Sequence, residues 1–143
     1  MKHVLHNPVF NALSSGDKQL SLGTDAVKFF DETVSPFAGF EESYTKGFAD
    51  LHELLPPGRK ILYAIPTPIT LPTGWQVQHE IKGLQFVYEG DLTIKNEFDN
   101  VVPLTEMHIE EMVALATLTK PGPFATGTIK FGFYHGIFDK DKL

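Results

Sequence analysis

The sequence contains no cysteine and only one arginine, Arg59. Without cysteine the chain can form no disulfide, no thiolate metal site and no cysteine nucleophile. One arginine allows at most one bidentate clamp, so a polyphosphate site built on several arginines is excluded. The net charge of −6 argues against nucleic-acid binding, because such binding draws most of its affinity from clustered lysine and arginine. We therefore expect no nucleic-acid partner.

The sequence also lacks a long apolar run and any familiar catalytic motif. No run approaches the ~20 apolar residues that a membrane-spanning helix needs, and residues 1–8 lack the apolar core of a signal peptide. His-Glu-x-x-His, Gly-x-Ser-x-Gly, the P-loop and Gly-x-Gly-x-x-Gly are all missing. We expect a cytoplasmic protein with no membrane contact and no metal site, and spacing alone assigns no catalytic residue.

What is present is the composition of an ordinary globular protein. The 143 residues are 42% hydrophobic and 21% charged, which suits one domain or two very small ones. A chain of this length can bury roughly 68–70% of its unfolded surface, which is enough for a core without disulfides or metals. Twelve phenylalanines predict a core rich in contacts between rings.

Three segments have helical spacing and recognisable ends. They are residues 8–15, Ser43 to Leu55 and Thr105 to Thr119. Asn, Ser or Thr stands at each capping position, and glycine or proline follows each end. The third helix has the clearest pattern, because Ile109, Met112, Val113 and Ala116 recur at i, i+3, i+4 and i+7. Lys120-Pro121-Gly122-Pro123-Phe124 then stops it, and residues 124–133 form either another short helix or an irregular turn.

Short strands are predicted between these helices. They are Gln19–Leu22, Ala26–Phe30, Lys60–Ile65, Gly74–Ile81, Gly83–Tyr88, Val101–Leu104 and Phe133–Phe138. The run at 60–65 is typical of a strand covered on both faces, whereas alternation at 74–88 predicts strands with one buried face. Residues 35–40 are expected to form an apolar loop, and residues 89–100 a surface linker. These elements predict an α+β fold, with a mixed, mostly antiparallel sheet and about three helices packed on it.

From Val101 to Leu143 the chain resembles the opening of a GNAT-type N-acyltransferase domain of the FR47-like subgroup. The matching residues are Val102-Pro103-Leu104-Thr105, the helix 106–119, Lys120-Pro121-Gly122-Pro123-Phe124, Thr128, Gly132, Tyr134 and Gly136-Ile137. The N-terminal part is similar to the leader region of the same subgroup, through residues 7–13, Leu22-Gly23 and Pro36-Phe37-Ala38. The resemblance implies a GNAT-like leader domain at residues 1–95 and the start of an acyltransferase domain at 96–143.

The resemblance implies an N-acetyltransferase that moves an acyl group from acetyl-CoA to the amine of a small molecule or peptide. Phe124, Tyr134 and His135 would line part of the acceptor pocket, and the alternative for all three is packing. Such enzymes bind the acyl-CoA pyrophosphate on a loop, (Arg/Gln)-x-x-Gly-x-(Gly/Ala), that opens a helix. That loop is absent from this sequence, so no cofactor-binding residue is assigned. The resemblance therefore implies the N-terminal portion of the enzyme, with an incomplete C-terminal half.

Two alternatives remain open at this stage. The chain could be a non-catalytic interaction or ligand-binding module with a GNAT-like fold. In that case an unpaired apolar strand at Phe133–Phe138 would allow a homodimer to form by strand pairing. Alternatively, the loop that carries Phe37 and Phe40 could bind a small molecule.

Overall fold

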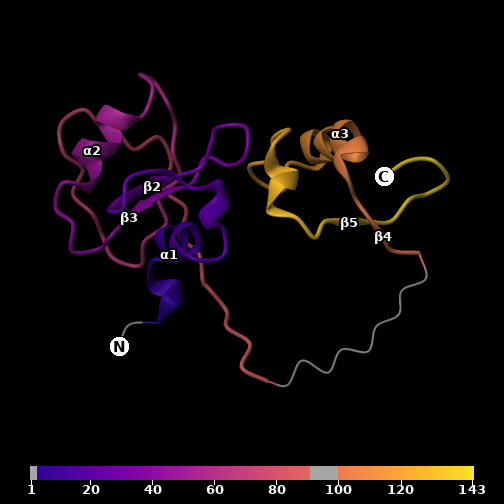
Figure 1. The fold of residues 1–143 in the computed structure, drawn as a ribbon, viewed down its shortest axis with the longest axis horizontal. Helices are drawn as coiled ribbons and strands as arrows, with labels where there is room; N and C mark the ends of the chain where they lie inside the picture. The colour runs from indigo at the N-terminus through magenta and orange to yellow at the C-terminus, as the bar shows by residue number, and fades with distance from the viewer. Residues whose placement is uncertain (1–2, 91–99) are drawn as a thin grey trace.

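A computed structural model of the chain describes residues 3–90 and 100–143, and its elements form an N-terminal and a C-terminal group (Figure 1). The first group contains the 3-10 helices η1 (Val4–His6) and η2 (Lys18–Leu20), the strands β1 (Leu22–Gly23), β2 (Val27–Phe29) and β3 (Ala38–Phe40), and the helices α1 (Pro8–Ser14) and α2 (Gly47–Leu54). The second contains β4 (Val102–Pro103), η3 (Glu106–His108), α3 (Ile109–Thr119), η4 (Thr128–Phe131) and β5 (His135–Gly136). The strands form two sheets, β1-β2-β3 and β4-β5, and every pairing within them is antiparallel. The α+β fold expected from the sequence is thus confirmed.

The N-terminal core forms between a three-stranded sheet, in the order β1-β2-β3, and α2. Its buried residues are Val27, Phe29, Ala38, Phe40, Leu51 and Leu55. The Phe40 ring stacks on Tyr63 at 4.9 Å and meets Phe48 edge-on at 5.0 Å between ring centroids. The phenylalanines therefore supply the ring contacts that the composition predicts, and each such pair adds to the stability gained from burial alone.

A second apolar cluster connects α1 to the C-terminal group. Val9 and Leu13 of α1 are buried with Phe30 and Val34 from the segment between β2 and β3. Phe131 of η4 packs against this cluster and meets Phe30 edge-on, with 5.1 Å between ring centroids. η4 thus belongs to the second group by sequence and contacts the core of the first.

Two hydrogen bonds hold η4 at this junction. The Gly127 N–H donates to the Thr33 carbonyl at 2.8 Å, and the buried Thr128 hydroxyl donates to the Val34 carbonyl at 2.9 Å. Buried polar groups are costly when unpaired, so these bonds favour one position of η4 against the segment 33–34. Residues 124–133 therefore contain the short helix that the sequence left as one of two options.

The C-terminal group begins with the pairing of β4 and β5, in which Val102 lies opposite Gly136. Leu104 extends this pair, because its N–H donates to the Tyr134 carbonyl at 2.8 Å. The expected strand Phe133–Phe138 is therefore shorter than predicted. It is also paired on one side, which corrects the expectation of an unpaired edge. Thr105 forms a capping box with His108 at η3, which leads into α3, so the predicted cap lies on a 3-10 turn that precedes the α-helix.

The other helix boundaries follow the predictions with one correction. α1 ends at Ser14 and α3 at Thr119, close to the expected residues. α2, however, begins at Gly47 rather than after Ser43. The Ser43 hydroxyl bonds to the Glu41 carboxylate, so it does not cap the helix.

Several predicted strands differ from the structure because a strand needs a partner as well as a pattern. Lys18–Leu20 is a 3-10 helix, whereas the expected loop at 35–40 contains β3. The run at 60–65 makes only a single parallel bridge, between Leu62 and Phe37. The segments 74–81 and 83–88 form no strand. Their alternating pattern finds no paired strand among the described residues.

The segment 77–88 consequently leaves large apolar side chains in water. Ile81, Leu84 and Phe86 are 87%, 86% and 87% exposed. The predicted linker at 89–100, and with it the domain boundary at residue 95, falls largely on residues 91–99, outside the described part of the chain. Within the described residues, no helix is long and apolar enough to cross a membrane.

Candidate functional site

An apolar groove of about 500 Å³ lies between α3 and the β4–β5 pair. α3 contributes Met112, Leu115 and Ala116, and β5 contributes His135 and Gly136. No lysine, arginine, aspartate or glutamate of the described chain lines it. The groove can therefore accept an apolar group, but it offers no charged side chain to a phosphate.

The end of α3 brings Phe124 to this groove. Lys120 adopts a left-handed conformation with φ 51°, and its N–H donates to the Ala116 carbonyl at 2.8 Å. Pro121 cannot extend the helical hydrogen bonds, so the chain turns away at this point. Pro121 and Phe124 then both line the groove. The stop signal in the sequence thus shapes one wall of the site.

The structure brings the three predicted site residues together. Phe124 and His135 line the groove, and Tyr134 lies behind Phe124, with the two rings edge-on at 6.0 Å and 81°. Burial raises the pKa of Tyr134 above its ordinary value, so its phenol stays protonated at neutral pH. Tyr134 can therefore donate a hydrogen bond, but it does not line the groove.

His135 contributes an imidazole to the lining of the groove. It is exposed, and its Nδ1 lies 2.9 Å from the Phe133 carbonyl oxygen. A carbonyl can only accept, so Nδ1 carries the hydrogen in that bond. In the neutral ring Nε2 is then an unprotonated acceptor. An apolar groove beside a potential base is suited to an uncharged amine with an apolar body.

Sequence reasoning missed the apolar walls of the groove. Leu104, Leu115 and Leu143 line it together with Met112. Met112 was expected on the buried face of the third helix, and Leu115 follows it at i+3, so helical spacing was a usable signal. Leu104 and Leu143 carried no such signal, because their place depends on the pairing of β4 with β5.

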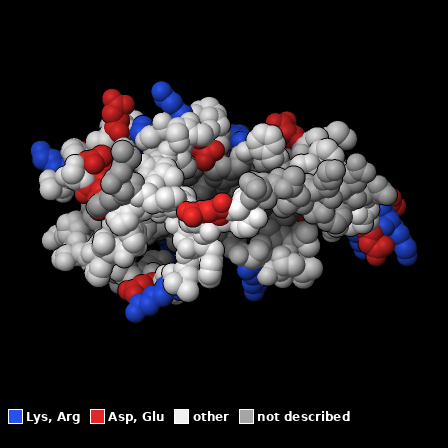
Figure 2. All heavy atoms as spheres, turned by 90° about the horizontal axis from the view of Figure 1, so that it is seen from below, with Lys and Arg blue, Asp and Glu red and all other residues white. Residues whose placement is uncertain are grey.

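The Phe37 and Phe40 loop does not form an open site. Phe40 is buried in the first cluster, and Phe37 packs against the second. No three His, Asp or Glu side chains of the described residues gather closely enough to hold a metal ion. On the face in Figure 2, lysine and arginine side chains are spread out rather than gathered over one element.

The fold has a counterpart among solved structures. A crystal structure of a protein assigned as a GNAT-family acetyltransferase, from Novosphingobium aromaticivorans, matches this chain with a TM-score of 0.82 and 26% sequence identity. The match covers 99% of this chain and 62% of that one, so this chain spans about three fifths of its neighbour's length. No protein-family model and no curated protein matches the sequence. The described part of the chain therefore has a GNAT-like fold.

Proposed function

We propose that the chain is the N-terminal portion of an acetyl-CoA-dependent N-acetyltransferase of the FR47-like subgroup, acting on the amine of a small molecule or peptide. The observation that carries the proposal is the match to a GNAT-family protein over 99% of this chain. The neighbour's additional length supports the idea that further residues complete the site. The position of Phe124 and His135 in one groove supports their assignment to the acceptor side.

The residues present would orient the acceptor. Leu115 and Phe124 would hold its carbon skeleton, and the Nε2 atom of His135 would take the proton that the amine must lose. Holding a nucleophile in a reactive geometry can itself supply much of the rate enhancement in such a transfer. No lysine or arginine among the described residues lines the groove, so these residues offer no cation to the pyrophosphate of CoA. That part of the site would lie elsewhere in the complete enzyme.

Two measurements on the native protein test this proposal together. We expect intact-mass analysis to give a product heavier than the 16.0 kDa of this chain, and calorimetry to detect acetyl-CoA binding to that product. In the complete enzyme, His135→Gln should lower kcat, because it removes the group that takes the amine proton, while Phe124→Ala should mainly raise KM for the amine. A native product of 16.0 kDa that does not bind acetyl-CoA would overturn the proposal.

A second candidate function is association without catalysis. Ile81, Leu84 and Phe86 support it, because they expose a run of large apolar side chains, and such patches commonly mark interaction surfaces. The outer edges of β4 and β5 offer a further place for a second copy to pair. Sedimentation at micromolar concentration tests this candidate. We expect the protein to form dimers, and we expect Phe86→Lys to weaken dimer formation. A strict monomer would remove this candidate.

A further inference from the structure

A second hollow of about 390 Å³ lies at the C-terminal end of α2, on residues that do not line the groove beside α3. Its walls come from α2, from residues 55–61 and from residues 74–78. The last of these segments has no regular secondary structure. Its position must therefore come from turns and side-chain contacts.

Two turns of the same kind frame this hollow. In Pro56-Pro57-Gly58-Arg59 the Arg59 N–H donates to the Pro56 carbonyl at 3.1 Å, and Gly58 has φ +80°. In Pro72-Thr73-Gly74-Trp75 the Trp75 N–H donates to the Pro72 carbonyl at 3.3 Å, and Gly74 has φ +96°. Glycine with positive φ at the third position is typical of a type II turn. Both turns therefore restrict the backbone on either side of the hollow.

Trp75 is anchored on α2 from the second turn. Its indole N–H donates to the Phe48 carbonyl at 2.9 Å, and its ring lies 5.6 Å from Phe48 and 6.3 Å from His52 between centroids. Gly74 allows this approach, since a Cβ there would lie only 3.3 Å from the His52 ring. The indole thus forms a fixed aromatic wall.

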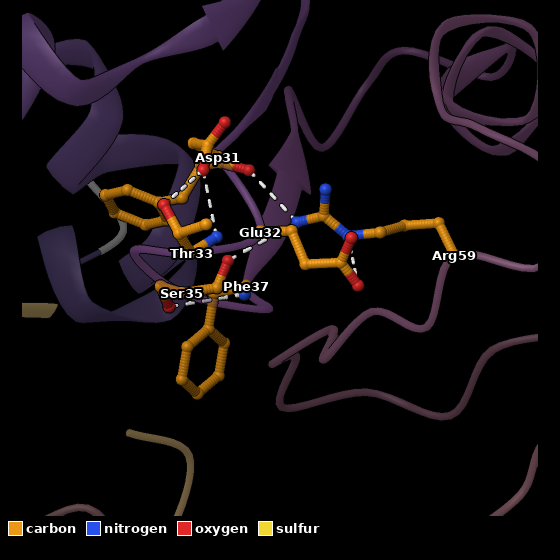
Figure 3. Close-up of polar contacts among 7 residues, drawn as sticks. Asp31, Glu32, Thr33, Ser35, Phe37 and Arg59 are labelled. Carbon is orange, nitrogen blue, oxygen red and sulfur yellow. Dashed lines mark hydrogen bonds and ion pairs between the residues drawn. The ribbon is translucent and has the colours of Figure 1, made fainter. Parts of the chain in front are cut away.

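The charged side chains that line the hollow are cationic, and the Glu32 carboxylate lies 3.9 Å from Arg59 Nε. Lys60 and Arg59 line it with Gln76 and Gln78, and no aspartate or glutamate of the described residues does, although the whole chain has a net charge of −6. The Arg59 guanidinium is already engaged (Figure 3), because it donates to the carbonyls of Phe30 and Ser35 at 3.1 and 3.5 Å. Lys60 is exposed and is the cation that a ligand can meet.

The partial negative charge at the C-terminal end of α2 does not cancel the positive charge of Lys60. The C-terminal end of a helix carries about half a negative charge. Lys60 carries a full positive charge, which exceeds the partial charge of the helix end. The charged side chains that line the hollow therefore favour an anion, and the amides of Gln76 and Gln78 can donate hydrogen bonds to it.

We propose that this hollow binds a small aromatic carboxylate. The ligand ring would lie between Trp75 and the Pro56-Pro57 wall, and its carboxylate would meet Lys60 and the two glutamine amides. Such a site, a largely apolar cavity with a few convergent polar groups, has the general form of small-ligand sites. The inference does not depend on the acetyltransferase proposal, because the two sites share no lining residue.

The protein contains its own reporter for this site, because Trp75 is its only tryptophan. We would titrate the chain with benzoate, benzamide and benzylamine, which share one ring and differ in charge. Benzoate should change the Trp75 emission in a saturable way, with a dissociation constant of about a millimolar for a ligand of this size. Benzamide should bind about tenfold more weakly, since it loses one charge-assisted contact, and benzylamine should not saturate.

Matched variants distinguish binding in this hollow from a general effect of the protein's charge. Lys60→Gln should reduce the benzoate affinity about tenfold, to that of benzamide. Lys46→Gln, at the other end of α2, should leave it unchanged. If Lys60→Gln fails to fold, Gln78→Leu gives the same test and should weaken benzoate binding. No saturation with benzoate, equal binding of benzylamine, or equal effects of Lys60→Gln and Lys46→Gln would overturn the proposal.

Discussion

Thr128 is the polar side chain on which the junction between the two groups depends most. Its hydroxyl donates to the Val34 carbonyl and accepts from the Ala125 N–H, both at 2.9 Å. The residue is only 6% exposed, so water cannot readily replace either bond. One hydroxyl therefore satisfies two backbone groups, and its bond to Val34 joins residues 94 positions apart in the sequence.

We expect Thr128→Val to destabilise the protein by about 1–3 kcal/mol. Valine has nearly the same shape, so the loss comes from leaving a buried carbonyl and a backbone N–H without partners. Urea denaturation measures the change in free energy of unfolding. The exposed neighbour Thr126 provides the control, since Thr126→Val should change it by about 0.5 kcal/mol or less. Equal effects of the two variants would contradict this role.

Tyr63 gives the protein a defined response to alkaline pH. Burial, with a smaller contribution from Glu42, raises the pKa of Tyr63 to about 12. Because the folded-state pKa is raised, the stability that Tyr63 contributes is complete below the ordinary tyrosine pKa of about 10. That stability is lost as the pH rises from there through about 12.

Absorbance titration at alkaline pH should show one tyrosine that ionises later than the others. This late ionisation should be absent from Tyr63→Phe, while the ionisation of the other tyrosines at lower pH should remain. The free energy of unfolding should also fall less between neutral and alkaline pH in Tyr63→Phe than in the parent protein. A late-titrating tyrosine that persists in Tyr63→Phe would show that the assignment is wrong.

Among the elements, α2 and β3 lie unusually close together. A Cβ on Gly47 would lie 2.2 Å from the Phe40 ring, and that ring is held between Phe48 and Tyr63. The ring has no open space to move into, so the absence of a side chain at Gly47 permits the helix to pack there.

We expect Gly47→Ala to destabilise the protein by about 1–3 kcal/mol through overpacking. In an unobstructed helix the same change is favourable, because alanine has the higher helix propensity. Gly16→Ala is the control, since nothing lies within 4 Å of a Cβ at Gly16. Thermal melts of both variants test this, and a higher Tm for Gly47→Ala than for the parent would refute the steric explanation.

The elements also differ in how well local sequence predicts them. The third helix followed from its apolar spacing and its Thr105 cap, because helical hydrogen bonds form within one segment. Residues 74–88 carry an equally regular alternation, yet no strand forms there. Strand hydrogen bonds require a neighbouring chain segment, and the local pattern cannot say whether one is present. Trp75 in this segment is anchored by a contact with a residue 27 positions away, which no local pattern announces.

At the scale of the whole molecule, η4 connects the C-terminal group to the N-terminal core (Figure 1). Gly127 lies at this contact, where a Cβ would be 2.8 Å from the Thr33 carbonyl oxygen. Backbone atoms cannot move away as a side chain can. A side chain at residue 127 should therefore separate η4 from the segment that it contacts.

We expect Gly127→Ala to loosen the C-terminal group while the N-terminal core remains folded. Amide hydrogen exchange should become faster at residues 128–136 and stay nearly unchanged in β2, β3 and α2, because local opening follows local contacts. Gly83→Ala is the control, as a Cβ there meets nothing within 4 Å. A uniform loss of protection in both groups would instead indicate a single cooperative unit.

The sequence by itself determined the fold class, the three helices and the sharp end of the third helix at Lys120-Pro121. These depend on residues within a few positions of one another, through caps, periodicity and proline. Tertiary structure alone decided which strands form, that Leu104 joins Phe124 and His135 in one groove, and that two Pro-x-Gly turns frame the hollow at Trp75. Those features depend on contacts between segments that are distant in the sequence. The physical reason is that a paired strand or an enclosed groove needs two surfaces, and a local sequence pattern describes only one of them.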